Sequence, residues 1–239
     1  MHTNPTPPIE LTGTAARLVA PLVALPDGFV TALQGICDVV TTAERVADAS
    51  RDWWPLAMHW AVNGQVPQLA AAIARPTSTT EVAAVLQACS AAGVPVTPAG
   101  GRSSVVGATV PVHGGVLLDL TAMQGVVAVD AVSGLVEVLP GTFGPDLEDE
   151  LRTRHGLTVG HFPQSFDIAT VGGWVGHRGA GQYSTRYGKI EDIVAGLEVV
   201  LADGTIVRTG GSPAAAQGPD LTQLFVGSEG TLGVVTRVW

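Results

Sequence analysis

The chain has 239 residues, of which 46% are hydrophobic and 14% are charged. Ordinary globular proteins carry about 25% charged residues, so this composition excludes a disordered chain and allows a sizeable buried core. The formal net charge is −9 and no basic cluster is present, which excludes a general nucleic-acid partner. Thirty glycines without a three-residue repeat exclude collagen and indicate many tight turns.

The cysteine content and the hydropathy pattern indicate a compartment. Cys37 and Cys89 form neither a disulfide framework nor a CxxC metal site, which favours two buried thiols in a reducing compartment. No stretch reaches the about 20 uninterrupted apolar residues of a membrane span, and residues 1–10 lack the basic start of an export signal. We therefore expect a cytoplasmic protein without a membrane span.

The N-terminal quarter differs from the rest in composition and in the spacing of its apolar residues. Residues 1–27 are rich in Pro and Thr and are expected to be mostly irregular, whereas residues 28–65 are expected to be helical. Apolar side chains recur there at helical spacing, at Phe29, Val30, Leu33 and Ile36. The segment also carries three tryptophans, Trp53, Trp54 and Trp60. We expect them to pack onto the following domain, with a substrate-facing role as the alternative.

From residue 66 onward, short apolar strands alternate with helices. A capping-box pattern at residues 78–81 predicts a helix that Gly93 ends. Strands are expected at 94–97, 115–120, 125–130, 135–139, 193–201, 205–209 and 233–238, and further helices at 144–155 and 219–225. Asp203-Gly204 predicts a hairpin. The chain stops inside an apolar strand, so we expect more protein beyond Trp239.

Three glycine-bearing loops are candidates for chemistry. Residues 100–104 follow a strand and offer free backbone N–H groups that suit a diphosphate, although a plain turn is the alternative. Gly172 and Gly173 follow the helix-capping Thr170, and they could serve either a flat or anionic ligand or close packing. Residues 227–233, with three glycines, indicate a constrained turn.

The sequence lacks the signature motifs of several other enzyme classes. The sequence has no P-loop, no G-x-G-x-x-G after a strand and no G-x-S-x-G elbow. The histidines lack metal-ligand spacing, so no metal site is expected. His113 and His155 are interpreted as surface or loop residues.

Taken together, the loops resemble a known family. In order and spacing, they are similar to the vanillyl-alcohol-oxidase type of flavin domain, also called the PCMH-type FAD domain. Within it, the chain looks most like the alkyldihydroxyacetonephosphate synthase (alkylglycerone-phosphate synthase) family. The runs that carry this likeness are residues 160–165, 170–174, 178–181, 187–192, 218–220 and 227–233. Relatives that oxidise D-lactate or glycolate usually have an Asn-Ala-Gly-Gly-like run at 178–181, where this chain reads Arg-Gly-Ala-Gly.

The resemblance implies an α+β fold. It consists of two small α/β subdomains over residues 66–239, preceded by the tail and helical segment of residues 1–65. FAD is expected between the subdomains, with its flavin ring aimed at a C-terminal substrate domain that the chain lacks. Without that domain, we expect weak FAD binding and no turnover.

The resemblance also implies the residues that bind the cofactor. The diphosphate loop matches Pro98, Ala99, Gly100, Gly101, Arg102, Ser103 and Ser104. The segment beside the flavin matches Gln164, Ser165, Thr170, Val171, Gly172 and Gly173, and a third stretch matches His177, Arg178, Gly179 and Ala180. The fourth matches Glu229, Gly230, Thr231, Leu232, Gly233, Val234 and Val235. His161 matches a histidine found near the flavin and is the candidate catalytic or flavin-tuning residue, a structural loop histidine being the alternative.

The chain departs from the family pattern in its first loop. The family usually reads Gly-x-Gly-Thr-Ser, whereas Arg102 and Ser103 stand here in place of the last Gly and the Thr. Arg does not easily adopt a positive φ. The loop therefore bends differently, or Arg102 points outward, or it pairs with the diphosphate. Residues 98–107 contain no His, so we expect FAD to be held non-covalently.

The resemblance implies exchange of an acyl group for a fatty alcohol in ether-lipid synthesis, with the flavin acting as an electrophile and no net redox change. Two alternatives stay open, an FAD-dependent 2-hydroxy-acid (D-lactate-type) dehydrogenase and a non-catalytic FAD-binding fragment. The expected partner is a small-molecule or lipid-like substrate, and a homodimer is left open.

Overall fold

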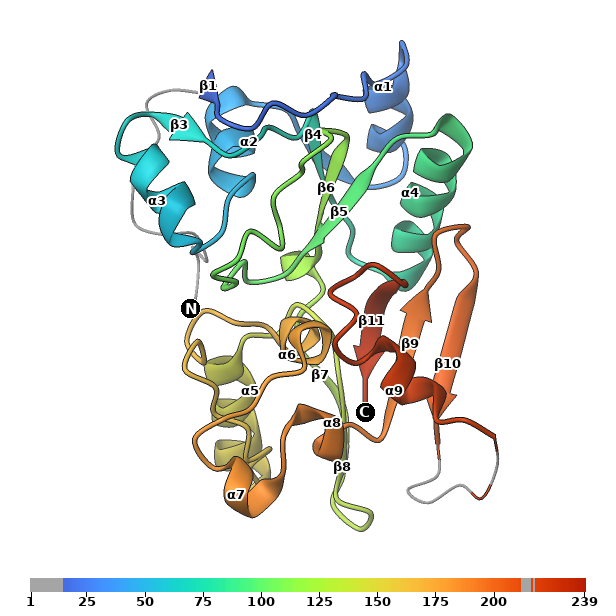
Figure 1. The fold of residues 1–239 in the computed structure, drawn as a ribbon. Helices are drawn as coiled ribbons and strands as arrows, with labels where there is room; N and C mark the ends of the chain where they lie inside the picture. Colours follow the sequence, from blue (N-terminus) through green and yellow to red (C-terminus); the bar gives the residue numbers. More distant parts are fainter. Residues whose placement is uncertain (1–14, 212–215, 217) are drawn as a thin grey trace.

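The computed structural model describes residues 15–211, 216 and 218–239, and it has two lobes (Figure 1). Most of the predicted tail, residues 1–14, lies outside the described residues. No helix within the described ranges is long and apolar enough to cross a membrane. The two lobes fit the expected α+β class with two small subdomains.

The first lobe is built on a four-stranded sheet. Its order is β2 (Asp38–Val40), β4 (Ala72–Arg75), β6 (Val116–Asp119) and β5 (Val96–Ala99). The last three strands run parallel, while β2 pairs antiparallel with β4. Because alternate side chains point to opposite faces, Val116 and Leu118 join one core cluster and Leu117 joins another.

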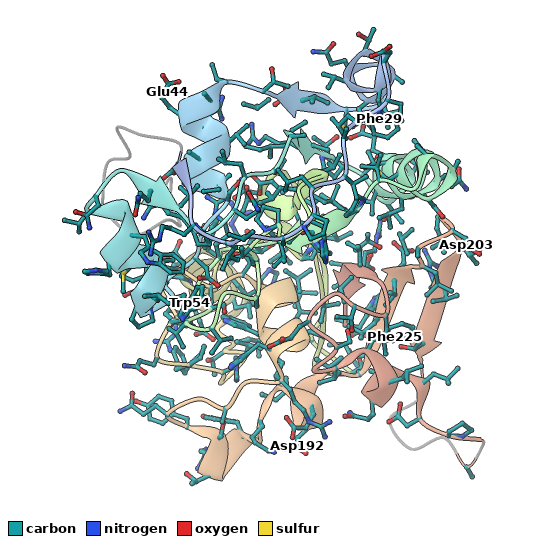
Figure 2. The ribbon with its side chains drawn as sticks, turned by 45° about the horizontal axis from the view of Figure 1, so that its top comes forward. Phe29, Glu44, Trp54, Asp192, Asp203 and Phe225 are labelled. Carbon is teal, nitrogen blue, oxygen red and sulfur yellow. The ribbon has the colours of Figure 1, made fainter. Side chains whose placement is uncertain are left out.

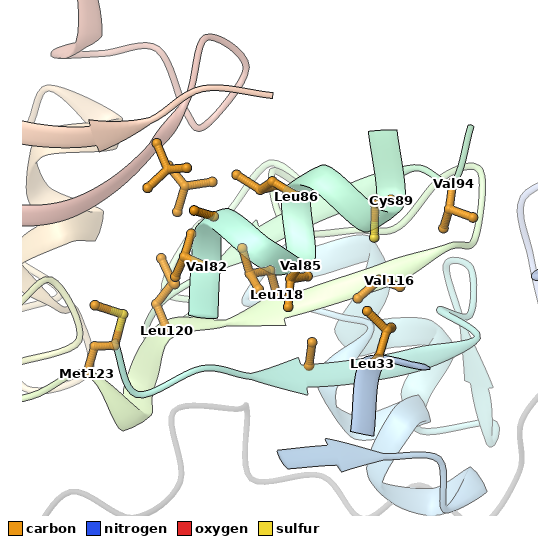
Figure 3. Close-up of a cluster of buried hydrophobic side chains, with 14 of the residues drawn as sticks. Leu33, Val82, Val85, Leu86, Cys89, Val94, Val116, Leu118, Leu120 and Met123 are labelled. Atoms are coloured by element: carbon orange, nitrogen blue, oxygen red, sulfur yellow. The ribbon is translucent and has the colours of Figure 1, made fainter. Parts of the chain in front are cut away.

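Helices cover both faces of this sheet. The helix α4 (Thr79–Ala92) begins at Ser78, whose hydroxyl accepts the backbone N–H of Glu81, and ends at Gly93 in the left-handed conformation, as the sequence predicts. Its apolar face packs on β6, as the close-up in Figure 3 shows. The helix α2 (Ala43–Ala49) covers the opposite face.

The N-terminal segment is more varied than predicted. Residues 28–65 were expected to be helical, but the structure has three short helices, α1 (Phe29–Gln34), α2 and α3 (Pro55–Ala61), with β2 between the first two. The run Val39-Val40 pairs with β4 because its branched side chains complete the sheet edge, and this long-range pairing overrides the helical pattern. Two further short strands, β1 (Ala15–Ala16) and β3 (Gln65–Val66), pair in parallel.

The second lobe is built on an antiparallel sheet of five strands. Its order is β10 (Ile206–Gly210), β9 (Gly196–Val200), β11 (Val234–Val238), β8 (Leu135–Val138) and β7 (Val126–Asp130). The predicted hairpin at Asp203-Gly204 is confirmed, because β9 and β10 pair antiparallel around it and Gly204 has a φ of 84°. All seven strands predicted from residue 66 onward are present in the two lobes, with ends shifted by up to three residues.

Short helices complete the second lobe. They are α5 (Gly144–Glu150), its π-helical continuation η2 (Leu151–His155), α6 (Val171–His177), α7 (Ser184–Tyr187), α8 (Ile190–Ile193) and α9 (Leu221–Phe225). The short turn η1 (Leu120–Ala122) leads from β6 toward this lobe. In Figure 1, α6 lies between the two lobes. Trp174 of α6 is part of the core beneath the sheet, with Leu147 and Val199.

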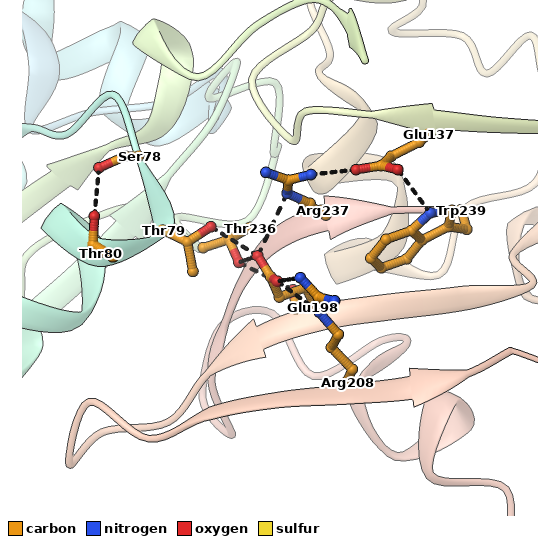
Figure 4. A network of polar contacts seen from close by, with 9 residues as sticks. All are labelled: Ser78, Thr79, Thr80, Glu137, Glu198, Arg208, Thr236, Arg237 and Trp239. Atoms are coloured by element: carbon orange, nitrogen blue, oxygen red, sulfur yellow. Dashed lines mark hydrogen bonds and ion pairs between the residues drawn. The ribbon is translucent and has the colours of Figure 1, made fainter. Parts of the chain in front are cut away.

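A buried carboxylate connects the lobes, as Figure 4 shows. Glu198 on β9 is 3% exposed and accepts hydrogen bonds from Thr79 Oγ1 of α4 at 2.7 Å and from Thr236 Oγ1 at 3.1 Å. Arg208 Nη2 lies 2.8 Å from the other carboxylate oxygen, and Arg237 Nε lies 3.7 Å from Oε1. Burial alone would raise the pKa of Glu198, but the hydrogen bonds from Thr79, Arg208 and Thr236 lower it below its ordinary value.

We predict that Glu198→Gln destabilises the protein by about 1–3 kcal/mol at pH 7, because an amide leaves Arg208 facing a second donor. The unfolded-state pKa of Glu is about 4.3. Since the folded value is lower, the stabilisation is present above the unfolded pKa and is lost as pH falls through the folded pKa. Urea unfolding at pH 7 and in acid measures this. Glu150→Gln, at an exposed ion pair, is the control, and a Glu198→Gln deficit that does not shrink in acid would contradict the prediction.

Candidate functional site

A cleft of about 480 Å³ lies at the junction of the lobes, and three loops line it. The predicted cofactor residues on its wall are Pro98, Ala99, Gly100, Gly101, Arg102, Ser103, Ser104, Ser165, Thr170, Gly172, Gly173, His177, Glu229, Gly230, Gly233, Val234 and Val235. Those that are not on its wall are Gln164, Val171, Arg178, Gly179, Ala180, Thr231 and Leu232. Thr231 and Leu232 line a neighbouring hollow against β5 and β9.

Glycines allow the loops to touch one another. A Cβ on Gly101 would lie 2.0 Å from the Ile168 carbonyl oxygen, and one on Gly100 would lie 2.4 Å from Thr170 Oγ1. A Cβ on Gly230 would lie 2.9 Å from Pro98. Real Cβ atoms do not approach so closely, so these glycines are required first for contact between loops. The sequence suggests room for a diphosphate or a plain turn at Gly100 and Gly101 and a constrained turn at Gly230, but not this contact between loops.

The contacts at the start of α6 distinguish the two roles considered for Gly172 and Gly173, which are ligand contact and close packing. Thr170 Oγ1 accepts the Gly173 N–H, while the N–H groups of Val171 and Gly172 donate to the carbonyls of Thr142 and Pro140. A Cβ on Gly172 would lie 2.8 Å from Pro140, whereas one on Gly173 would meet nothing closer than 3.4 Å. Gly172 therefore serves packing, and Gly173 forms open cleft wall.

The first loop has unused donors. The backbone N–H groups of residues 101–105 donate no hydrogen bond within the described residues. Consecutive free N–H groups of this kind form a concave site for anions. The loop therefore has the free backbone N–H groups that its sequence suggests.

Arg102 adds a buried cation to this loop. It is 8% exposed, adopts a φ of 52°, and forms no hydrogen bond or ion pair with any residue that the structure describes, its Nε being fully buried. Burial lowers its pKa, and the charges of Asp119 and Asp48 oppose that effect. Of the three sequence alternatives, an outward-pointing Arg102 is wrong. A buried guanidinium without a direct ion pair is costly, and the more distant charges of Asp119 and Asp48 offset only part of that cost, so an anion entering the cleft would stabilise it.

Backbone strain gathers at the same loops. Among the described residues, three non-glycine residues have a positive φ: Arg102, Arg178 and Glu229, at 52°, 57° and 50°. All three belong to segments predicted to bind the cofactor. Glu229 is held there because its N–H donates to the Gly176 carbonyl at the end of α6. Strain of this kind concentrates at ligand sites, where surrounding contacts fix the backbone.

His161 lies behind the cleft wall. It is fully buried, and its ring meets that of Trp174 edge-on at 4.9 Å between centroids. Neither ring nitrogen has a hydrogen-bond partner in the described part of the chain. Burial and the nearby His177 lower the pKa of His161 to about 4. The imidazole is therefore neutral at pH 7, and two of its neighbours, Trp174 and His177, line the cleft.

Seven residues of the wall lie outside every segment that the sequence singles out: Val105, Val106, Ala108, Thr109, Leu120, Pro140 and Gly176. Three more, Ala169, Trp174 and Ser228, lie within those segments but are not named as cofactor-binding residues. The two valines are 59% and 70% exposed and directly follow the first loop, so their position next to it was an available signal. Leu120 and Pro140 belong to no motif, and only the tertiary fold brings them to the cleft. Within the described ranges, no group of His, Cys, Asp and Glu side chains could hold a metal ion.

The comparisons with known proteins identify the family. The family described as "FAD binding domain" matches residues 70–210, which is more than half of the chain. The chain therefore belongs to this family of FAD-binding domains, of the PCMH type that the sequence resembles, and FAD is its cofactor.

The relatives are much longer than this chain. It is 40% identical over 167 residues to the glycolate oxidase subunit GlcD of Bacillus subtilis, a match that covers 70% of this chain and 35% of that protein. It is 32% identical over 179 residues to alkyldihydroxyacetonephosphate synthase of Caenorhabditis elegans, covering 73% and 30%. A solved structure titled alkyldihydroxyacetonephosphate synthase superposes with a TM-score of 0.83 at 28% identity, covering 98% of this chain and 46% of that one. The chain thus spans about a third of the curated relatives.

We predict opposite outcomes for two neighbouring glycines. Gly172→Ala should destabilise the fold by about 1–3 kcal/mol because its methyl group meets Pro140. Gly173→Ala should leave stability unchanged or raise it by up to about 1 kcal/mol, yet weaken FAD binding because the methyl group enters the cleft. Urea unfolding and fluorescence titration with FAD measure the two effects. Unchanged FAD affinity in Gly173→Ala would show that FAD does not contact this wall.

Proposed function

We propose that the chain is the FAD-binding part of an alkyldihydroxyacetonephosphate synthase-like flavoprotein, with FAD held non-covalently in the cleft. The observation that carries the cofactor site is the run of free N–H groups at residues 101–105 beside the partnerless guanidinium of Arg102. Superposition over 98% of the chain on a solved synthase supports that branch.

The residues present fit FAD. The backbone donors of residues 101–105 would bind the diphosphate, and Arg102 would be its counterion. Leu120, Val234 and Val235 are apolar parts of the wall that would exclude water. When bound, FAD supplies an electrophilic flavin ring, and the protein's share is to position that ring and keep the site dry.

His161 is proposed as a flavin-tuning residue. Its neutral imidazole lies against Trp174, which itself lines the cleft. Through this contact it would set the position of the Trp174 ring. Because burial lowers its pKa, the imidazole is uncharged at neutral pH and has no imidazolium proton to donate to a group in the cleft.

A second candidate is an FAD-dependent 2-hydroxy-acid dehydrogenase. The 40% identity to a glycolate oxidase subunit and the 37% identity to a D-lactate dehydrogenase of Anaerostipes hadrus favour it. A non-catalytic FAD-binding protein is the third candidate. A small or lipid-like substrate fits the first two.

The experiment that separates these functions uses the FAD-loaded parent protein, in which a substrate domain is expected to accompany this chain, because the chain by itself is expected not to turn over. Exchange of a labelled fatty alcohol into acyl-dihydroxyacetone phosphate without flavin reduction is the expected result. Bleaching of the flavin absorbance by a 2-hydroxy acid would overturn it in favour of the dehydrogenase. Bound flavin with neither reaction would favour the non-catalytic protein, and acid precipitation should release the flavin into the supernatant.

We predict that Arg102→Gly weakens FAD binding by about 10- to 100-fold, because charge-assisted hydrogen bonds contribute about 1.5–3 kcal/mol. Glycine also relieves the left-handed backbone strain, worth about 1–2 kcal/mol. The variant should therefore remain folded, and an affinity loss would reflect the missing guanidinium. Arg154→Ala, at an exposed ion pair, is the control. FAD affinity in Arg102→Gly equal to that of the wild type would contradict pairing with the diphosphate.

A further inference from the structure

The short connection from α2 to α3 lies against the cofactor loop, although some fifty residues separate them in sequence. The Trp53 N–H donates to the Ser104 carbonyl at 2.9 Å. The Trp54 ring packs against Gly107, where a Cβ would lie 3.2 Å from it and φ is 82°. Trp54 stands at the N-terminal end of α3 (Figure 2), and its ring meets that of Trp60 edge-on at 5.4 Å. The packing interpretation of Trp54 is thereby confirmed.

Between these contacts stands a buried carboxylate. Asp52 is fully buried, and its Oδ1 accepts the Trp54 N–H at 2.9 Å. The carboxylate also faces the Ser104 hydroxyl and the backbone of Gly107 and Thr109. Burial raises the pKa of Asp52, and these neighbours offset part of the rise. Its Oδ2 is buried and makes no regular hydrogen bond within the described part of the chain.

Within the loop of residues 104–109, hydrogen bonds converge on the Ser104 side chain. Ser104 Oγ accepts the N–H groups of Val106 and Ala108 at 3.2 and 3.4 Å, which leaves its own proton free to point at Asp52. Val105 and Val106 are largely exposed and line the cleft. The stretch that carries the unused donors thus depends on contacts from outside itself.

We propose that Asp52 is a positioning residue for the cofactor: from inside the turn of residues 104–109, it fixes the loop so that the N–H groups of residues 101–105 converge on the FAD diphosphate. The proposal rests on the proposed FAD site. It makes the segment before residue 66 part of the cofactor site, through a residue that lies outside the cleft wall.

The chain offers a matched control. Asp130 organises the turn between β7 and β8 in a similar way, its carboxylate accepting the N–H of Val132 at 2.9 Å and the Ser133 hydroxyl at 2.6 Å. It lies outside the cleft wall. Asp52→Asn and Asp130→Asn make the same chemical change in two turns, and only the first turn belongs to the cofactor loop.

The test combines FAD titration with amide hydrogen exchange of the FAD-free protein. We expect Asp52→Asn to bind FAD about tenfold more weakly and to exchange faster at residues 104–109, with exchange in β9 unchanged. Asp130→Asn should match the wild type in FAD affinity. Wild-type FAD affinity and loop exchange in Asp52→Asn would overturn the proposal. If the wild type itself bound no FAD, the proposed function would fail, while loop exchange would still report whether Asp52 holds the loop.

A second variant keeps the proposal testable if Asp52→Asn does not fold. Ser104→Ala removes the hydroxyl that faces Asp52 and should produce the same local exchange and the same affinity loss. In the double variant, the two losses should not add, because both remove one shared interaction. Additive losses of FAD affinity would overturn the proposal.

Discussion

The close contact of three loops at the lobe junction is the constraint on which the rest of the site depends. Gly101 abuts the Ile168 carbonyl, Gly100 abuts Thr170, and Gly230 abuts Pro98, at distances that no side chain permits. This contact places elements of both lobes around one cleft. The N–H groups of Val171 and Gly172 at the start of α6 donate to the carbonyls of Thr142 and Pro140, whereas those of residues 101–105 donate to no described residue and can receive an anion.

Two buried charged side chains, Glu198 and Arg102, differ in whether the protein itself supplies their partners. Glu198 is satisfied by hydrogen bonds from α4, β10 and β11, and it connects the lobes. Arg102 is also buried, yet no hydrogen bond or ion pair joins its guanidinium to any described residue, and its Nε is buried without a partner. The guanidinium at the wall of the cleft is the group that we propose to pair with the cofactor. A diphosphate carries the complementary charge.

The family explains why one cleft is compatible with several reactions. Relatives named as glycolate oxidase, D-lactate dehydrogenase and alkyldihydroxyacetonephosphate synthase match over about 70% of this chain and about a third of their own lengths. The shared portion holds the loops that we propose to bind FAD. Fold alone does not define a reaction, and the residues that distinguish these reactions need not lie in the part that is shared.

The sequence by itself determined the features that depend on local hydrogen bonds and turn chemistry. The Ser78 cap, the Gly93 stop, the Asp203-Gly204 hairpin and the positions of the predicted strands along the chain all follow from neighbouring residues. Only the tertiary structure decided the rest. It placed β2 in the sheet, His161 behind Trp174 and Asp52 against the loop of residues 104–109. Each of these depends on contacts between residues far apart in the chain, and local periodicity carries no record of such contacts.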